Sequence, residues 1–83
     1  IAFLSGIRME GFDKRGMIKE IIDIITSQHN LNIRSLNIAT KNGVFTGEVM
    51  LYIENVKALN GLIEQLRKID NIEKIERIGF DIA

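Results

Sequence analysis

Residues 7–29 read IRMEGFDKRGMIKEIIDIITSQH, and within this stretch the spacing of the apolar side chains changes once. Ile7 and Met9 alternate with charged residues, which is the period-two pattern of a half-buried strand. From residue 16 to 29 the apolar residues recur instead at helical spacing, at Ile18, Ile21, Ile22 and Ile25. The sequence therefore predicts a strand over 7–12 joined directly to a helix over 16–29.

The helix predicted over 16–29 has a weak intrinsic tendency to form. Four isoleucines fall within EIIDII, residues 20–25, and β-branched side chains lose rotamer freedom in a helix. We therefore expect this helix to depend on packing its apolar stripe against a sheet.

A β-hairpin is predicted after this helix. Asn42-Gly43 separates two strand-like runs, residues 31–40 and 44–54, and both turn residues tolerate positive φ. The first run changes phase near Arg34 and Ser35, which predicts a bulge. The second run alternates, with one face made by Phe45, Val49, Leu51 and Ile53 and the other by Thr46, Glu48, Met50 and Tyr52.

The rest of the chain predicts a second helix and a last strand. Asn55 can cap a helix whose apolar residues recur at helical spacing: Val56, Leu59, Leu62, Ile63 and Leu66. After this helix the sequence predicts a short turn and a final strand that includes Ile78, Phe80 and Ile82.

The predicted order is strand, helix, strand, strand, helix, strand. Helices of about 14 residues are ~20 Å long and match strands of six or seven residues. We therefore expect an α+β fold, a ferredoxin-like βαββαβ sandwich in which a four-stranded antiparallel sheet carries both helices on one face and the first and third strands are central. Its 83 residues indicate one domain, 1–83. Because the chain opens IAFLSG without an initiator methionine, we expect this domain to be a piece of a longer protein.

Composition argues against several functions. Lys plus Arg and Asp plus Glu number 11 each, so no net field holds a polyanion. The chain has no cysteine and one histidine, and it lacks the common nucleotide-binding and hydrolase motifs. We expect no catalytic residues, no metal and no cofactor in this chain, no membrane span, and a cytoplasmic location.

RNA recognition on the open face of the sheet is weakly indicated. RNA-binding members of this architecture stack bases on aromatic residues of the central strands. Here that face offers Tyr52 and Phe12 with Arg8. Three glutamates expected on the same face would repel phosphate: Glu10, Glu48 and Glu54.

The junction FDKRGMI, residues 12–18, has the chemistry of an amino-acid site. If Asp13 caps the helix, the backbone N–H groups of Arg15, Gly16 and Met17 can receive a carboxylate, and Asp13 can accept from an ammonium group. Gly16 lets a ligand or a neighbouring backbone come close. The alternative is that Asp13 is only a cap and Gly16 only relieves the turn.

The junction and the order of elements together resemble an ACT domain, a small regulatory module of amino-acid-responsive enzymes. Residues 13–18, DKRGMI, are similar to the family's D-[RK]-x-G-[LM]-[LI] turn, and residues 31–33, LNI, to its [VI]-N-[IV] start of the second strand. Four segments resemble, in order, the C-terminal ACT domain of RelA/SpoT proteins, the GTP pyrophosphokinases and (p)ppGpp hydrolases of the stringent response: IRMEGFDKRGMI, NLNIRSLNI, NGVFTGEVMLYI and IEKIERI.

The resemblance implies a regulatory role for this chain, with the synthetase and hydrolase domains upstream in the parent protein. It implies an amino acid bound between two copies, touched by Asp13 of one and by Asn32 of the other. The ligand-binding residues that we predict are Asp13, Lys14, Arg15, Gly16, Met17 and Asn32. Asp13 departs from the asparagine, and Arg15 from the frequent proline, of the family's typical turn.

A homodimer is also expected from the predicted fold. A sheet with both helices on one face leaves the other partly bare, where Met50, Tyr52 and Phe3 would lie. The main hypothesis is therefore a dimeric domain that senses an amino acid or the nutritional state and controls (p)ppGpp synthesis and hydrolysis. The alternatives are a module that docks on ribosomal RNA or protein, and a purely structural dimerisation domain.

Overall fold

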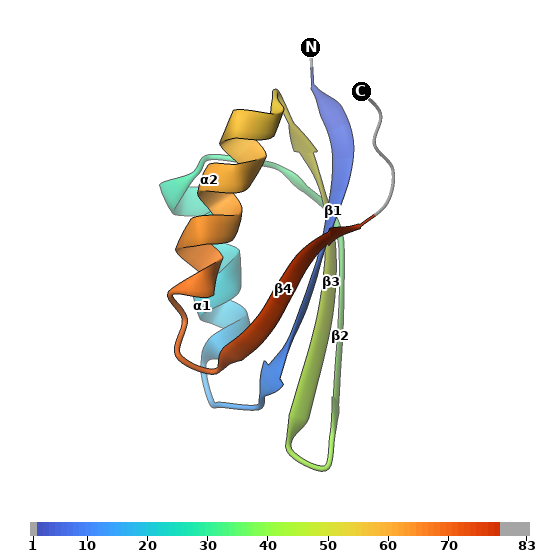
Figure 1. Ribbon diagram of the computed structural model, residues 1–83, viewed down its shortest axis with the longest axis vertical. Helices are drawn as coiled ribbons and strands as arrows, with labels where there is room; N and C mark the ends of the chain where they lie inside the picture. Colours follow the sequence, from blue (N-terminus) through green and yellow to red (C-terminus); the bar gives the residue numbers. More distant parts are fainter. Residues whose placement is uncertain (1, 79–83) are drawn as a thin grey trace.

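The computed structural model describes residues 2–78 and has the predicted order of elements (Figure 1). In chain order these are β1 (Phe3–Phe12), α1 (Met17–Asp23), a π-helix η1 (Ile24–Gln28), β2 (Ile33–Lys41), β3 (Val44–Ile53), α2 (Val56–Arg67) and β4 (Ile72–Ile78).

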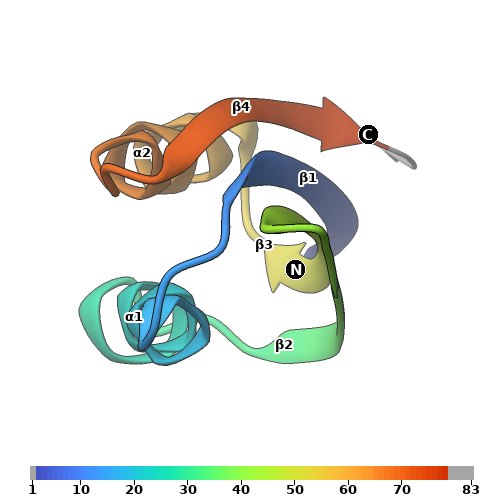
Figure 2. The same ribbon diagram turned by 90° about the horizontal axis from the view of Figure 1, so that it is seen from below.

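The four strands form one antiparallel sheet in the order β2-β3-β1-β4. Figure 2 shows α1 and α2 on the same side of this sheet, with α1 near β2 and α2 near β4. The ferredoxin-like fold, with the first and third strands in the centre, is confirmed. None of the helices within residues 2–78 is long and apolar enough to cross a membrane.

The hydrophobic core lies between the helices and the sheet. Strand β3 buries one of the two faces predicted from its alternating sequence. The buried residues on this face are Phe45, Val49, Leu51 and Ile53. The buried residues from the rest of the chain are Ile7, Met9, Met17, Ile21, Ile24, Ile25, Leu59, Leu62, Ile63, Leu66, Ile69, Ile72 and Ile75.

The first strand and the first helix differ from their predicted bounds. β1 begins at Phe3 rather than at residue 7, because residues 3–6 pair with the end of β3. The helix is not uniform: α1 ends at Asp23 and continues as the π-helix η1, in which the His29 N–H donates to the Ile24 carbonyl.

The buried stripe of this helix is shifted from the predicted one. Ile18 is 45% exposed, whereas Met17 and Ile24 lie in the core beside Ile21 and Ile25. Ile24 and Ile25, the first two residues of the π-helix η1, are both buried.

The second helix begins as predicted. The Asn55 side chain accepts a hydrogen bond from the Ala58 N–H at 2.8 Å, so Asn55 is a true N-cap. Leu59, Leu62, Ile63 and Leu66 are buried, but Val56 is 51% exposed, since it lies in the first turn beyond the edge of the core.

Two bulges set the registers of the edge strands. In β2 the pairing with β3 shifts between Ile33 and Ser35, which confirms the bulge predicted near Arg34. In β4, Gly11 pairs with Ile72 and Glu10 with Lys74, so Glu73 is the extra residue. This second bulge explains why buried isoleucines of β4 are three residues apart. Phe80 and Ile82, which we placed in the final strand, lie outside the described residues.

Candidate functional site

The turn between β1 and α1 is held by backbone contacts rather than by a side-chain cap. The prediction that Asp13 caps the helix is wrong: Gly16 is the N-cap, with φ +82°, and no side chain bonds to the first turn. Asp13 lies three residues earlier, where its N–H donates to the carbonyl of Gly43 at 2.9 Å. The β2–β3 hairpin therefore determines the position of Asp13.

The expected cradle of free amides is also smaller than predicted. The Met17 N–H donates to the Lys14 carbonyl at 3.1 Å, and the Met17 side chain is buried in the core. The side chains of Asp13, Lys14 and Arg15 are exposed. Met17 therefore serves the turn and the core, and the residues that face solvent are those at positions 13–16.

Gly16 is required for its backbone conformation. Its φ lies in the left-handed region, which L side chains rarely adopt. A β-carbon at this position would meet nothing within 4 Å, so no part of the same chain presses on it. The space beside Gly16 is open to a ligand or to another molecule.

Asn32 lies at the opposite end of the domain from this turn. The segment between η1 and β2, which contains Asn32, and the β1–α1 turn lie at the two ends of the first helical segment (Figure 1). The seven residues of α1 and five of η1 separate them, roughly 18 Å along a helix axis. Asn32 is exposed, and its carbonyl accepts from the Tyr52 N–H at 3.3 Å. One chain therefore does not bring Asn32 together with residues 13–17.

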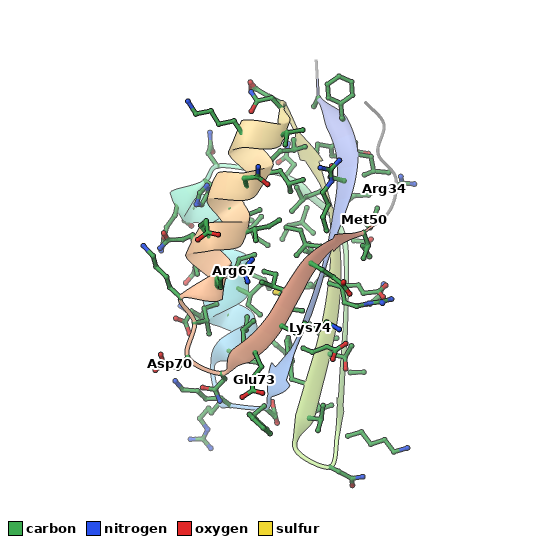
Figure 3. The ribbon with its side chains drawn as sticks, in the orientation of Figure 1. Arg34, Met50, Arg67, Asp70, Glu73 and Lys74 are labelled. Atoms are coloured by element: carbon green, nitrogen blue, oxygen red, sulfur yellow. The ribbon has the colours of Figure 1, made fainter. Side chains whose placement is uncertain are left out.

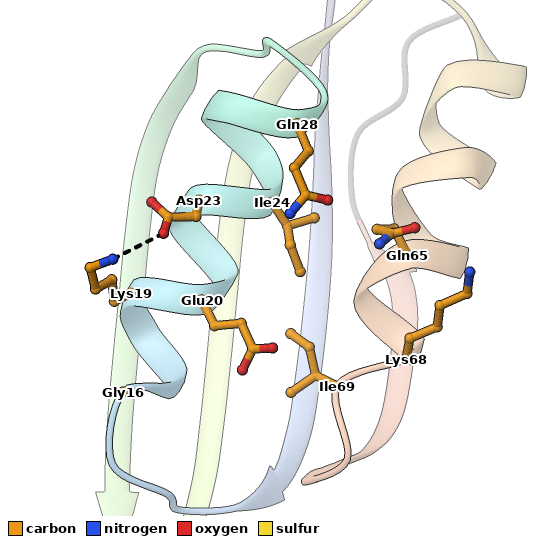
Figure 4. A pocket seen from close by; sticks show the side chains of 9 residues that line it. All are labelled: Gly16, Lys19, Glu20, Asp23, Ile24, Gln28, Gln65, Lys68 and Ile69. Atoms are coloured by element: carbon orange, nitrogen blue, oxygen red, sulfur yellow. Dashed lines mark hydrogen bonds and ion pairs between the residues drawn. The ribbon is translucent and has the colours of Figure 1, made fainter.

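A groove between the two helices was not predicted from the sequence. It has a volume of about 340 Å³, and Figure 4 shows its walls rising from α1, η1 and the end of α2. Of the predicted residues only Gly16 lines it. The others are Lys19, Glu20, Asp23, Ile24, Gln28, Gln65, Lys68 and Ile69. No motif links these positions, because they come from two segments about 40 residues apart in the sequence.

Residues 2–77 match the sequence pattern of a family described as the ACT domain. The chain belongs to the ACT domain family. ACT domains are regulatory domains, so the expectation of a regulatory module is confirmed at this level.

Solved structures agree with this assignment. The crystal structure of the ACT domain from the GTP pyrophosphokinase of Chlorobium tepidum is 36% identical to this ACT domain, with a TM-score of 0.85, over 94% of this chain and 100% of that one. The solution NMR structure of that domain is 35% identical, with a TM-score of 0.83, over 95% and 89%. The acetolactate synthase small subunit from Thermotoga maritima is 16% identical over 93% of this chain and 48% of that one, with a TM-score of 0.76, and shares the fold alone.

The face of this ACT domain's sheet that points away from the helices has a charged centre. The Arg8 side chain donates to a carboxylate oxygen of Glu48 at 3.0 and 2.6 Å, across the two central strands. This hydrogen bond and the charge of Glu48 raise the pKa of Arg8 above its usual value. Both side chains remain about 40% exposed, so the pair is only partly shielded from water.

One end of this open face is apolar. Gly6 leaves room for Met50 and Ile78, since a β-carbon on it would lie 2.8 Å from the Met50 sulfur and 2.9 Å from an Ile78 side-chain carbon. Leu4 and Tyr52 are paired beside them. Met50 lies on the side of the sheet away from the helices (Figure 3). Phe3, which we also expected on this face, pairs with Ile53 and shares the phase of the core residues instead.

Proposed function

We propose that this chain is the C-terminal regulatory domain of a cytoplasmic RelA/SpoT-type GTP pyrophosphokinase. It is itself non-catalytic, and it controls the (p)ppGpp synthetase and hydrolase domains upstream in the parent protein. The observation that carries the proposal is the likeness, along nearly the whole chain, to the ACT domain of a GTP pyrophosphokinase.

The proposed effector is an amino acid bound between two copies of the domain. The position of Asn32, about one helix length away from residues 13–17, supports this arrangement, since only a second copy can bring the two sets together. Strand β2 is an edge of the sheet and begins directly after Asn32. Two copies paired antiparallel through β2 would set the turn of one beside Asn32 of the other.

Regulation would then follow from a shift between two arrangements of the parent protein. An amino acid that binds the dimeric arrangement more tightly stabilises it by its difference in affinity for the two arrangements. The coupling is reciprocal. If the amino acid raises the affinity of the catalytic domains for a ligand by some factor, that ligand raises the affinity of the ACT domain for the amino acid by the same factor.

A titration of the chain with each amino acid, followed by backbone amide shifts, tests this site. We expect shifts at residues 13–17 and at Asn32, together with a dimer in sedimentation. Asn32→Ala should abolish the shifts at the turn, whereas Asn60→Ala, on the exposed side of α2, should leave them intact. A monomer at high concentration that shows no shifts at millimolar ligand would rule out the interface site.

The regulatory role itself is tested in the parent protein. We expect the ratio of (p)ppGpp synthesis to hydrolysis to change with the effector, and this response to be lost in the Asn32→Ala variant. Unchanged activities in a variant that no longer binds the amino acid would contradict amino-acid control.

A purely structural dimerisation domain is the second candidate, and the bare end of the open face favours it. Leu4, Met50 and Ile78 are half-buried there and Tyr52 is 41% exposed, although no helix within residues 2–78 covers this side. Met50→Glu should then dissociate the dimer without affecting residues 13–17.

Docking on ribosomal RNA is less favoured, because Arg8 is surrounded by the carboxylates of Glu10, Glu48 and Glu76.

A further inference from the structure

We infer that the groove between the two helices binds one free α-amino acid with an apolar side chain, within a single copy of the domain. The assumption that the ligand is an amino acid rests on the proposed function, but its location in the groove does not. This site uses α1, η1 and the end of α2, and it needs no second copy.

The size and the floor of the groove fit such a ligand. Its volume of about 340 Å³ lies near the lower end of the range for small-molecule pockets, roughly 300 to 1,000 Å³. Ile24 and Ile69 line it, and they are only 5% and 4% exposed, so their visible surface is the edge of the hydrophobic core. An aliphatic side chain placed there removes apolar surface from water.

The charged groups on the walls fit the two ends of an amino acid. Glu20 comes from α1 and Lys68 from the end of α2, and neither side chain has a hydrogen-bond or ion-pair partner within residues 2–78. By contrast, Lys19 already pairs with Asp23 at 3.2 Å. An ammonium group on Glu20 and a carboxylate on Lys68 would therefore each replace water rather than break an existing pair.

Two carboxamides complete the groove. Gln28 from η1 and Gln65 from α2 line opposite walls, and Figure 4 shows both side chains extending between the helices. Each carboxamide offers two N–H donors and one acceptor oxygen. They can bind the same ammonium and carboxylate groups, which gives the site more contacts for a zwitterion than for either charge alone.

The test uses leucine and two analogues that each lack one charge. L-Leucine should shift the amides of residues 19–28 and 65–69. Its deaminated analogue, 4-methylpentanoate, and its decarboxylated analogue, 3-methylbutylamine, should each bind at least about tenfold more weakly. Isoleucine, valine, methionine and phenylalanine are titrated in parallel, and a tighter binder among them is followed with its own two analogues.

Two variants separate the roles of the charges. Glu20→Gln should weaken leucine about tenfold and leave 4-methylpentanoate unchanged, because that analogue has no ammonium group. Lys68→Gln should weaken leucine similarly and leave 3-methylbutylamine unchanged. Matched controls on exposed residues outside the groove, Glu54→Gln and Lys57→Gln, should alter none of these affinities.

The outcomes distinguish this site from the interface site. Shifts confined to residues 13–17 and Asn32 would overturn the groove and support the interface. Groove shifts in a monomer would support the groove as a site that needs no second copy. The inference is also overturned if leucine binding survives both Glu20→Gln and Lys68→Gln, or if no amino acid shifts any amide at millimolar concentration.

Discussion

Gly11 of β1 faces the backbone carbonyl of Asn71 so closely that a β-carbon at residue 11 would overlap the carbonyl oxygen. The Phe12 N–H donates to that oxygen at 3.0 Å, and the Asn71 side chain donates to the Phe12 carbonyl at 3.4 Å. The end of β1 is thereby fixed to the segment that leads into β4. The turn at residues 13–16 starts from this fixed point.

Gly11→Ala should therefore destabilise the domain by about 2–3 kcal/mol, since the backbone around Asn71 has to move. Urea unfolding measures the change. Gly61→Ala is the control: nothing lies within 4 Å of a β-carbon there, and alanine in an exposed helix position should stabilise the domain by up to about 1 kcal/mol. A loss of only a few tenths of a kcal/mol in Gly11→Ala would show that the contact is easily relaxed.

Gly16→Ala and Gly43→Ala form a matched pair. Both glycines have positive φ and open space around a β-carbon, so each alanine should cost about 1–2 kcal/mol through backbone strain alone. Only Gly16 lies in the predicted turn and the groove, so amino-acid binding should weaken in Gly16→Ala and persist in Gly43→Ala. Equal binding by the two variants, measured by amide shifts, would exclude Gly16 from the ligand site.

Asn55→Ala should destabilise the domain by about 1 kcal/mol, because the Ala58 N–H loses its acceptor. Asn55→Asp should retain most of the stability, since its carboxylate can accept the same bond. Thermal unfolding of the two variants, beside Asn60→Ala in the exposed middle of α2, measures the effect. An equal loss in Asn55→Asp and Asn55→Ala would argue against capping.

The Arg8–Glu48 pair should contribute a coupling free energy that falls with salt. A double-mutant cycle with Arg8→Met and Glu48→Gln, measured at low and high ionic strength, isolates this quantity. Because the pKa of Arg8 is raised, its charge stabilises the folded state at every pH below the unfolded-state pKa, and this contribution is lost only as the pH rises through the folded-state pKa. Stability should therefore not change with the titration of Arg8 between neutral and mildly alkaline pH. A coupling that is insensitive to salt would mean that the pair is more shielded than its 40% exposure indicates.

The sequence by itself determined the features that depend on neighbouring residues. The change from period two to helical spacing after residue 12, the positive-φ turn at Asn42-Gly43, the bulge near Arg34 and the Asn55 cap are all observed. These signals are local, because a turn, a cap or an amphipathic stripe involves residues within one or two turns of each other. The order of elements followed from them, and with it the fold.

Only the tertiary structure decided which parts of the predicted site meet. Asp13 is positioned by Gly43, thirty residues away, and so does not cap the helix that follows it. Asn32 lies a helix length from the turn, and the groove with Glu20 and Lys68 exists because two helices pack side by side on one sheet. Contacts of this kind depend on register and packing between distant segments, which the spacing of residues along one segment does not encode.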